Sequence, residues 1–87
     1  MPKIEVYSTA VCPYCVAAKN LLKSRGLEWV EVRVDTDPAL REAMLARSGG
    51  QRTVPQIFIN DHHVGGFDQL AAADRSGRLQ QLLEPAA

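Results

Sequence analysis

The chain has 87 residues, of which 46% are hydrophobic and 23% charged, and its ten basic and ten acidic residues give no net formal charge at pH 7. This length predicts one domain spanning residues 1–87, because two cores of half the size would bury too little surface to be stable. The balanced charge argues against nucleic acid as a partner and against a trap for acidic substrates. Because the chain has no signal-like start and no bilayer-spanning apolar run, we expect no membrane partner and a cytoplasmic location.

The first part of the chain predicts a strand, a helix and a second strand. Residues 3–8 alternate between apolar and polar side chains, which is typical of a half-buried strand. Residues 13–25 then show helical spacing, and Gly26 is a suitable stop. The apolar stripe of this helix comprises Cys15, Ala18, Leu21 and Leu22. Residues 29–34 alternate again, which places Val30, Val32 and Val34 on one face. The result is a βαβ unit with a right-handed crossover.

A second helix and a hairpin follow. Asp37 is predicted as the N-cap of the second helix, with Pro38 at its first position and a Gly49-Gly50 pair at its end. The loop 51–55 leads into a buried strand over residues 57–59. Asn60-Asp61 suits a tight hairpin turn into a last strand over residues 62–64.

Two helices complete the predicted chain. Asp68 is expected to cap a helix that Gly77 ends, and a short last helix carries Leu79, Leu82 and Leu83. The tail, residues 85–87, is expected to fray. The order of these elements predicts the α/β class, with a four-stranded mixed sheet that has helices on both faces. A C-x-x-C motif beside a βαβ unit is associated with thioredoxin-like redox proteins.

Both cysteines of the chain lie in Cys12-Pro13-Tyr14-Cys15. Pro13 fits the first position of a helix, which places Cys12 near the N-cap, where unpaired N–H groups and the helix dipole stabilise a thiolate. The thiolate is the nucleophile of thiol–disulfide chemistry. Cys12 should be exposed and Cys15 more buried, so Cys12 is predicted as the nucleophile and Cys15 as the resolving thiol. A disulfide between them closes only a small loop and would be a poor structural staple.

The two cysteines have two alternative interpretations. One is that they pack as small core side chains on the helix, which the Pro-led helix start does not favour. The other is that they supply half of a zinc site that His62 and His63 complete. Adjacent residues on a strand point to opposite faces, so only one histidine would turn toward the cysteines. Solvated histidines on an edge strand and no metal are the preferred prediction.

Three blocks occur in a fixed order: Cys-Pro-Tyr-Cys at 12–15, Thr-Val-Pro at 53–55 and Gly-Gly-Phe-Asp at 65–68. In this order and spacing they resemble the glutaredoxins. The run over residues 53–59 is especially similar to the small bacterial dithiol glutaredoxins of type 3. The resemblance covers about residues 4–83 and implies a thioredoxin-like fold. It also implies a glutathione-dependent thiol–disulfide oxidoreductase with glutathione as co-substrate, no tightly bound cofactor and a monomeric state.

The resemblance also implies roles for individual residues. Val54–Pro55 should be a cis peptide bond facing the dithiol, and the Val54 backbone should pair with the cysteinyl part of glutathione as an added strand. The Phe67 N–H and the Asp68 carboxylate would hold the γ-glutamyl end. A guanidinium from Arg41 or Arg52 would suit the glycyl carboxylate. The glutathione-binding residues implied in this way are Tyr14, Arg41, Arg52, Thr53, Val54, Pro55, Gly66, Phe67 and Asp68.

The chain departs from the family pattern at two positions. Thr9 stands where many glutaredoxins have a lysine three residues before the nucleophile, which leaves the helix start to activate Cys12. Phe67 stands where some type 3 relatives have an extra cysteine, so there is no third thiol. The alternatives to a glutathione enzyme are a thioredoxin-type disulfide reductase, a glutathione-ligated iron–sulfur carrier and a non-catalytic interaction domain. Pro13 and the second cysteine argue against the iron–sulfur carrier.

Overall fold

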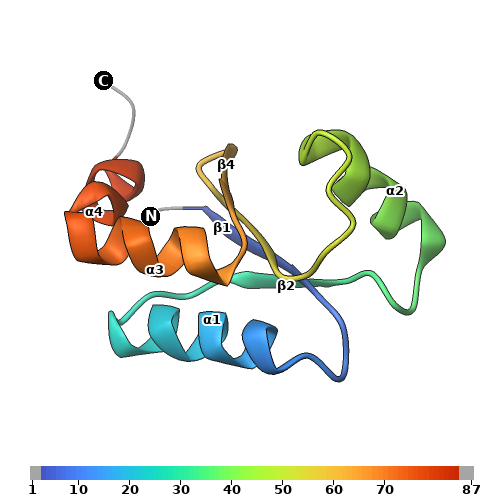
Figure 1. The fold of residues 1–87 in the computed structure, drawn as a ribbon, viewed down its shortest axis with the longest axis horizontal. Coiled ribbons are helices and arrows are strands. Elements are labelled where there is room, and N and C mark those ends of the chain that lie inside the picture. The colour runs from blue at the N-terminus through green and yellow to red at the C-terminus, as the bar shows by residue number, and fades with distance from the viewer. Residues whose placement is uncertain (1–2, 85–87) are drawn as a thin grey trace.

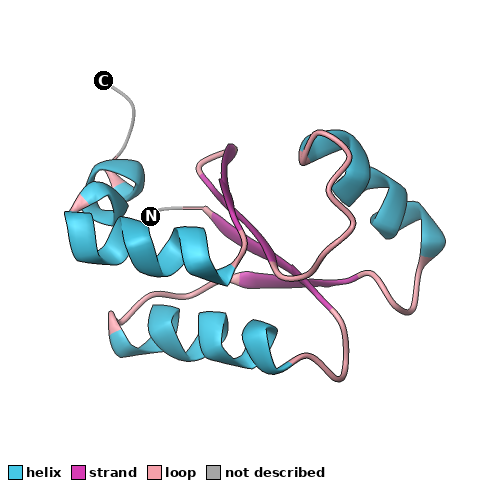
Figure 2. Ribbon diagram, in the orientation of Figure 1, coloured by secondary structure: helices cyan, strands magenta, loops and turns pink. Residues whose placement is uncertain are grey.

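Four strands form one mixed sheet in the order β2-β1-β3-β4 in the computed structural model, which describes residues 3–84 (Figures 1 and 2). The strands are β1 (Ile4–Ser8), β2 (Val30–Arg33), β3 (Gln56–Ile59) and β4 (His62–Gly65). The helices are α1 (Pro13–Ser24), α2 (Pro38–Arg47), α3 (Phe67–Ser76) and α4 (Arg78–Leu83). Strand β1 pairs in parallel with β2 and antiparallel with β3, and β3 pairs antiparallel with β4. The predicted four-stranded mixed sheet is confirmed, while the prediction for residues 85–87 lies outside the described residues.

Helices cover both faces of the sheet, as predicted (Figure 1). Helices α1, α3 and α4 pack on one face, where the buried side chains are Ile4, Val6, Ala18, Leu22, Ile57, Ile59, Leu70, Ala73 and Leu79. Helix α2 packs on the other face, where they are Tyr7, Val34, Met44 and Phe58. The central strand β3 is buried on both faces, which accounts for its continuous apolar run. Within residues 3–84, no helix is long and apolar enough to cross a membrane.

Most of the predicted helix starts and turns are confirmed. The Asp37 carboxylate caps α2 by accepting a hydrogen bond of 2.9 Å from the Ala39 N–H, and Pro38 follows at the first position. Asn60 and Asp61 both have positive φ angles, 50° and 67°, which is the backbone of a type I′ hairpin turn. Gly77, with φ of 83°, ends α3 in the left-handed conformation that glycine adopts without strain.

One detail of the prediction is wrong. Helix α3 begins at Phe67 with Gly66 as its N-cap, so Asp68 lies in the first turn instead of capping the helix. The reason is that the Gln69 side chain accepts a hydrogen bond of 2.9 Å from the Gly66 N–H, which starts the helix two residues earlier than expected.

The predicted alternation of β2 is confirmed by its regular pairing with β1, which places Val30 and Val32 on the same face. Val30 is nevertheless 62% exposed, because β2 is an edge strand and the α2 cluster includes Val32 and Val34 but not Val30.

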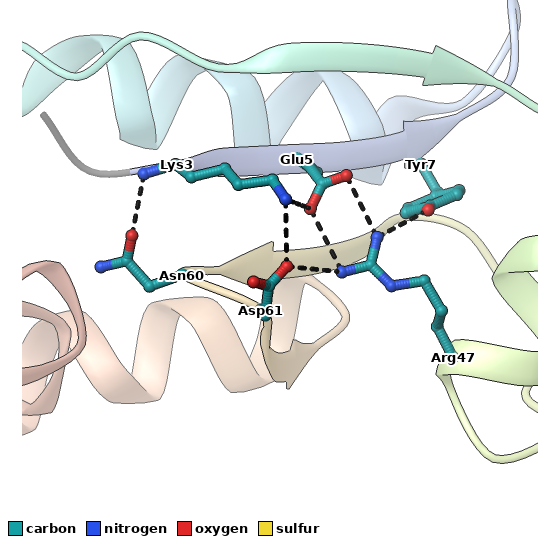
Figure 3. Close-up of polar contacts among 6 residues, drawn as sticks. All are labelled: Lys3, Glu5, Tyr7, Arg47, Asn60 and Asp61. Atoms are coloured by element: carbon teal, nitrogen blue, oxygen red, sulfur yellow. Dashed lines mark hydrogen bonds and ion pairs between the residues drawn. The ribbon is translucent and has the colours of Figure 1, made fainter. Parts of the chain in front are cut away.

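Arg47, in the last turn of α2, connects this helix to the sheet (Figure 3). Its guanidinium donates to both carboxylate oxygens of Glu5, at 3.1 and 3.2 Å, and to the Tyr7 hydroxyl at 2.8 Å. The same group lies 4.1 Å from the centre of the Phe58 ring and 3.4 Å from the Asp61 carboxylate. These contacts join α2, β1, β3 and the hairpin turn through one planar cation.

We predict that Arg47→Ala lowers the free energy of unfolding by about 1–2 kcal/mol, because it removes both hydrogen bonds to the largely buried Glu5 carboxylate, leaving only the longer Lys3 contact, and removes the cation–π contact. Arg41→Ala, an exposed arginine on the same helix, is the matched control and should change stability by less than about 0.5 kcal/mol. Urea unfolding of the two variants measures the difference. Equal losses would show that the Arg47 network adds nothing to the stability of the fold.

Candidate active site

The dithiol lies at the start of α1. Cys12 is the N-cap residue, in an extended conformation with φ of −152° and ψ of 102°, and Pro13 occupies the first helical turn. The Cys12 Sγ accepts a hydrogen bond of 3.2 Å from the Cys15 N–H. A sulfur in this position therefore caps a free backbone donor at the positive end of the helix dipole, where a thiolate is stabilised. The predicted placement of Cys12 at the N-cap is confirmed.

The two sulfurs have different surroundings. Cys12 is half-buried, whereas Cys15 is 1% exposed. Burial, followed by the hydrogen bond with Cys12, raises the pKa of the Cys15 thiol to about 12, although a Thr9 backbone hydrogen bond and the charge of Lys19 act in the opposite direction. Cys15 is therefore a neutral thiol near pH 7, and Cys12 is the accessible sulfur of the pair.

The loop 53–55 lies beside Cys12. The Val54–Pro55 peptide bond is cis, as the resemblance implied, and the Cys12 Sγ lies 3.8 Å from the Val54 carbonyl oxygen. Among residues 3–84, neither the N–H nor the carbonyl of Val54 has a backbone hydrogen-bond partner. Backbone groups without a backbone partner thus lie right beside the sulfur, where they are open for pairing.

A groove of about 260 Å³ runs from this loop to the start of α3. Its lining residues are Tyr14, Thr53, Val54, Pro55, Gly66, Phe67, Asp68 and Gln69. The Tyr14 and Phe67 rings lie 6.2 Å apart across it, and Tyr14 is 63% exposed. A Cβ at position 66 would lie 3.4 Å from the Pro55 carbonyl oxygen, so the start of α3 and the 53–55 loop approach each other closely here.

The start of α3 adds features that suit an anion. The groove lies at the N-terminus of this helix, which carries the positive end of the helix dipole, and Asp68 lies in its first turn. Backbone N–H groups next to one carboxylate supply both the donors and the acceptor that a zwitterionic amino-acid group requires. The groove is therefore chemically suited to a small peptide-like ligand with a free α-amino-acid end.

Seven of the nine residues predicted to bind glutathione line this groove, and Arg41 and Arg52 do not. Both arginines are exposed; Arg52 is adjacent in sequence to Thr53, and Arg41 is on α2. Gln69 lines the groove but was missed by the sequence interpretation. The sequence did indicate that Gln69 lies close to Gly66, because a glutamine three positions after a possible N-cap residue has the spacing of a capping box.

Asp35 was also missed. Its carboxylate accepts a hydrogen bond of 3.0 Å from the Ala10 N–H and forms a bidentate ion pair with Arg33 at 2.8 and 2.9 Å. The hydrogen bonds from Arg33, followed by that from the Ala10 backbone, lower the pKa of the Asp35 carboxyl to about 2. The segment before Cys12 is therefore tied to the end of β2 at all but strongly acidic pH.

The two histidines do not join the dithiol. His62 is exposed, as predicted, but His63 is partly buried, with its ring stacked on Phe58 at 4.8 Å and its Nε2 atom 2.7 Å from the Gln56 Oε1 atom. The prediction that both histidines are solvated is thus wrong for His63, because β4 turns this side chain onto the α2 face of the sheet. Within the described part of the chain, no three His, Cys, Asp or Glu side chains are grouped to hold a metal ion.

Sequence comparisons agree with the resemblance. The profile of the glutaredoxin family matches residues 4–64. The chain is 51% identical to a glutaredoxin of Pseudomonas aeruginosa, over 95% of this chain and 98% of that protein. It is 48% identical to glutaredoxin 3 of Escherichia coli, over 97% of this chain and the full length of that protein.

Solved structures give the same result. The solution structure of a glutaredoxin from Brucella melitensis superimposes with a TM-score of 0.80 at 44% identity, covering 93% of this chain and 87% of that one. The crystal structure of a buckwheat glutaredoxin–glutathione complex gives a TM-score of 0.82 at 34% identity, covering 92% of this chain and 74% of the buckwheat chain. The fold is therefore thioredoxin-like, and the chain belongs to the glutaredoxin family. It is a glutathione-dependent thiol–disulfide oxidoreductase.

We predict that iodoacetamide, added below one equivalent to the reduced protein near pH 7, alkylates Cys12 at least about a hundredfold faster than Cys15. With a pKa of about 12 for Cys15, only on the order of 10⁻⁵ of this thiol is ionised at pH 7. Peptide mass spectrometry locates the label, and Cys12→Ser serves as the control in which Cys15 stands alone. Comparable labelling of the two sulfurs would contradict the assignment.

Proposed function

We propose that Cys12 carries the sulfur exchange and that Cys15 is needed for only some substrates. The Cys12 thiolate attacks the glutathione sulfur of a protein–glutathione mixed disulfide, which forms a Cys12–glutathione disulfide and releases the protein thiolate. A second glutathione thiolate then attacks the bound glutathione sulfur. Glutathione disulfide leaves and the Cys12 thiolate is regenerated, so that each disulfide broken is matched by one formed.

Glutathione is proposed to lie along the groove, with its cysteinyl part next to Cys12. The N–H and carbonyl of Val54, which have no backbone partner among residues 3–84, support antiparallel pairing with the tripeptide backbone. The Phe67 N–H and the Asp68 carboxylate would hold the γ-glutamyl carboxylate and ammonium, which need a donor and an acceptor. The buckwheat glutaredoxin, whose structure was solved with glutathione, supports this ligand.

The remaining predicted binding residues differ in their position relative to the groove. Tyr14, Thr53, Pro55 and Gly66 line the groove and would shape it around the ligand. Arg52 adjoins the groove through Thr53 and suits the glycyl carboxylate by bidentate pairing. Arg41 is exposed on α2 and has no contact with the groove, so its role stays a prediction that rests on the resemblance alone.

Protein disulfides require the second cysteine. After Cys12 has opened such a disulfide, the Cys15 thiolate would attack the Cys12 sulfur of the mixed disulfide, and the client leaves with both thiols reduced. Glutathione then reduces the Cys12–Cys15 disulfide. The buried, neutral Cys15 must lose its proton for this step, which makes the dithiol route dependent on a deprotonation that the glutathione route avoids.

The single observation that carries the proposal is the placement of the Cys12 sulfur 3.8 Å from the Val54 carbonyl, beside an open backbone edge and the groove. The test is turnover of a small glutathione mixed disulfide in an assay coupled to NADPH through glutathione reductase. Turnover with thioredoxin reductase in its place would instead indicate a thioredoxin-type electron donor. Monomeric state, cytoplasmic location and the lack of a tightly bound cofactor stay predictions.

We predict that Cys15→Ser retains reduction of glutathione mixed disulfides to within about threefold but lowers reduction of a protein disulfide by at least about tenfold. Cys12→Ser should abolish both activities, because the other thiol of the chain, Cys15, is only 1% exposed. The two substrates are compared in the same coupled assay. A Cys15→Ser variant that loses both activities equally would disprove the separate roles of the two sulfurs.

A further inference from the structure

Gln56, the first residue of β3, has a fully buried carboxamide directly behind the Thr53–Pro55 loop. Its Nε2 atom donates to the Thr53 carbonyl at 3.0 Å, the Thr53 hydroxyl at 3.2 Å and the Gln51 side-chain oxygen at 3.2 Å. A carbonyl oxygen accepts hydrogen bonds and never donates, so the Nε2 end of the amide must face Thr53. The buried amide thus holds the residue that precedes Val54 by both its backbone and its side chain.

The other end of this amide is held by His63. The Gln56 Oε1 atom lies 2.7 Å from the His63 Nε2 atom, and because the oxygen accepts, His63 must carry a proton on Nε2. The imidazole ring is fixed in turn by stacking on Phe58, with ring centres 4.8 Å apart and planes 27° apart. Residue 63 is paired with Phe58 across the β3–β4 ladder, so the strand register delivers the ring to this position.

The surroundings of this imidazole favour its neutral form. Burial lowers the pKa of His63, and electrostatic interaction with His62 and Arg47 lowers it further. A neutral imidazole has one N–H, and the contact with Gln56 assigns it to Nε2. His63 therefore acts as a single, directed hydrogen-bond donor to a buried acceptor that has no other partner among residues 3–84.

We infer that His63 is a positioning residue for glutathione: it donates to Gln56, and Gln56 holds the Thr53–Pro55 loop so that the Val54 backbone is set to pair with the ligand. His63 itself lies outside the groove and touches no reacting atom. Without the His63 donor, the Gln56 oxygen is buried and unpaired, and rotation of the amide to find a partner breaks its contacts with Thr53. The inference rests on the proposed binding of glutathione along Val54.

The test compares two substitutions at position 63 with a matched one at position 62. His63→Phe keeps a ring to stack on Phe58 but has no donor, whereas the Nε2 atom of His63→Gln takes the place of the imidazole Nε2 and donates. His62→Phe is the control, because His62 is exposed and its side chain points away from Gln56. The measurements are KM and kcat for a glutathionylated peptide, and the rate of Cys12 alkylation by iodoacetamide, which needs no glutathione.

We expect His63→Phe to raise KM roughly five- to tenfold with kcat changed by less than about twofold, since Val54 pairing binds the glutathione portion throughout the reaction. Alkylation of Cys12 should be unchanged, and His63→Gln and His62→Phe should keep KM within about twofold of the natural protein. An unchanged KM in His63→Phe, or an equal rise in His63→Phe and His63→Gln, overturns the inference. If the natural protein does not turn over the peptide, the proposed function fails instead.

A measurement on the natural protein tests the inference without any substitution. The imidazole ¹⁵N chemical shifts of neutral His63 should report the Nε2–H tautomer, with the Nδ1 atom unprotonated. The Nδ1–H tautomer would leave the Gln56 oxygen without a donor and would overturn the inference even if His63→Phe did not fold.

Discussion

The hydrogen bond from the Cys15 N–H to the Cys12 sulfur is the contact on which the chemistry of this protein depends. The Cys12 sulfur caps the helix in the way that a Ser, Thr or Asp side chain caps other helices. The geometry that starts the helix is therefore the same geometry that places the sulfur where a thiolate is stabilised. Pro13 sets the first turn, and the Asp35 contact with the Ala10 N–H holds the preceding segment. The reactive sulfur is therefore positioned by the backbone on both of its sides.

The order of the strands explains why distant motifs meet at this sulfur. Strand β1 runs toward Cys12 and pairs antiparallel with β3, so the end of β1 lies beside the start of β3 and the Thr53–Pro55 loop. Strand β4 also runs antiparallel to β3, with Gly65 paired to Ile57, so its end brings the start of α3 to the same edge. Three segments far apart in sequence thus border one groove because of sheet register. The Arg47 contacts hold α2 and the hairpin turn against this frame (Figure 3).

Much of this arrangement was predictable because the local sequence signals for strands, helix starts and turns favour the same fold as the order of the elements. Alternation in β1, the Pro-led starts of α1 and α2 and the Asn60-Asp61 turn each follow from local sequence, and the order of elements leads to the mixed sheet. The cap of α3 was not predictable from Asp68 alone, since the Gln69 side chain had to fold back onto the Gly66 N–H. Similarly, alternation places Val30 on the face of Val32 and Val34 but does not show how far α2 covers β2, so the exposure of Val30 could not be predicted. The contact between His63 and Gln56 depends on strand register, which the residue pattern leaves open.

Binding of glutathione in the groove beside Cys12 can be observed in the amide NMR spectrum of the Cys15→Ser variant before and after it forms a stable mixed disulfide with glutathione. We expect the largest shifts, apart from those next to Cys12, at Val54 and at residues 66–68. Shifts confined to the neighbours of Cys12, with Val54 and the start of α3 unchanged, would contradict binding of glutathione in the groove.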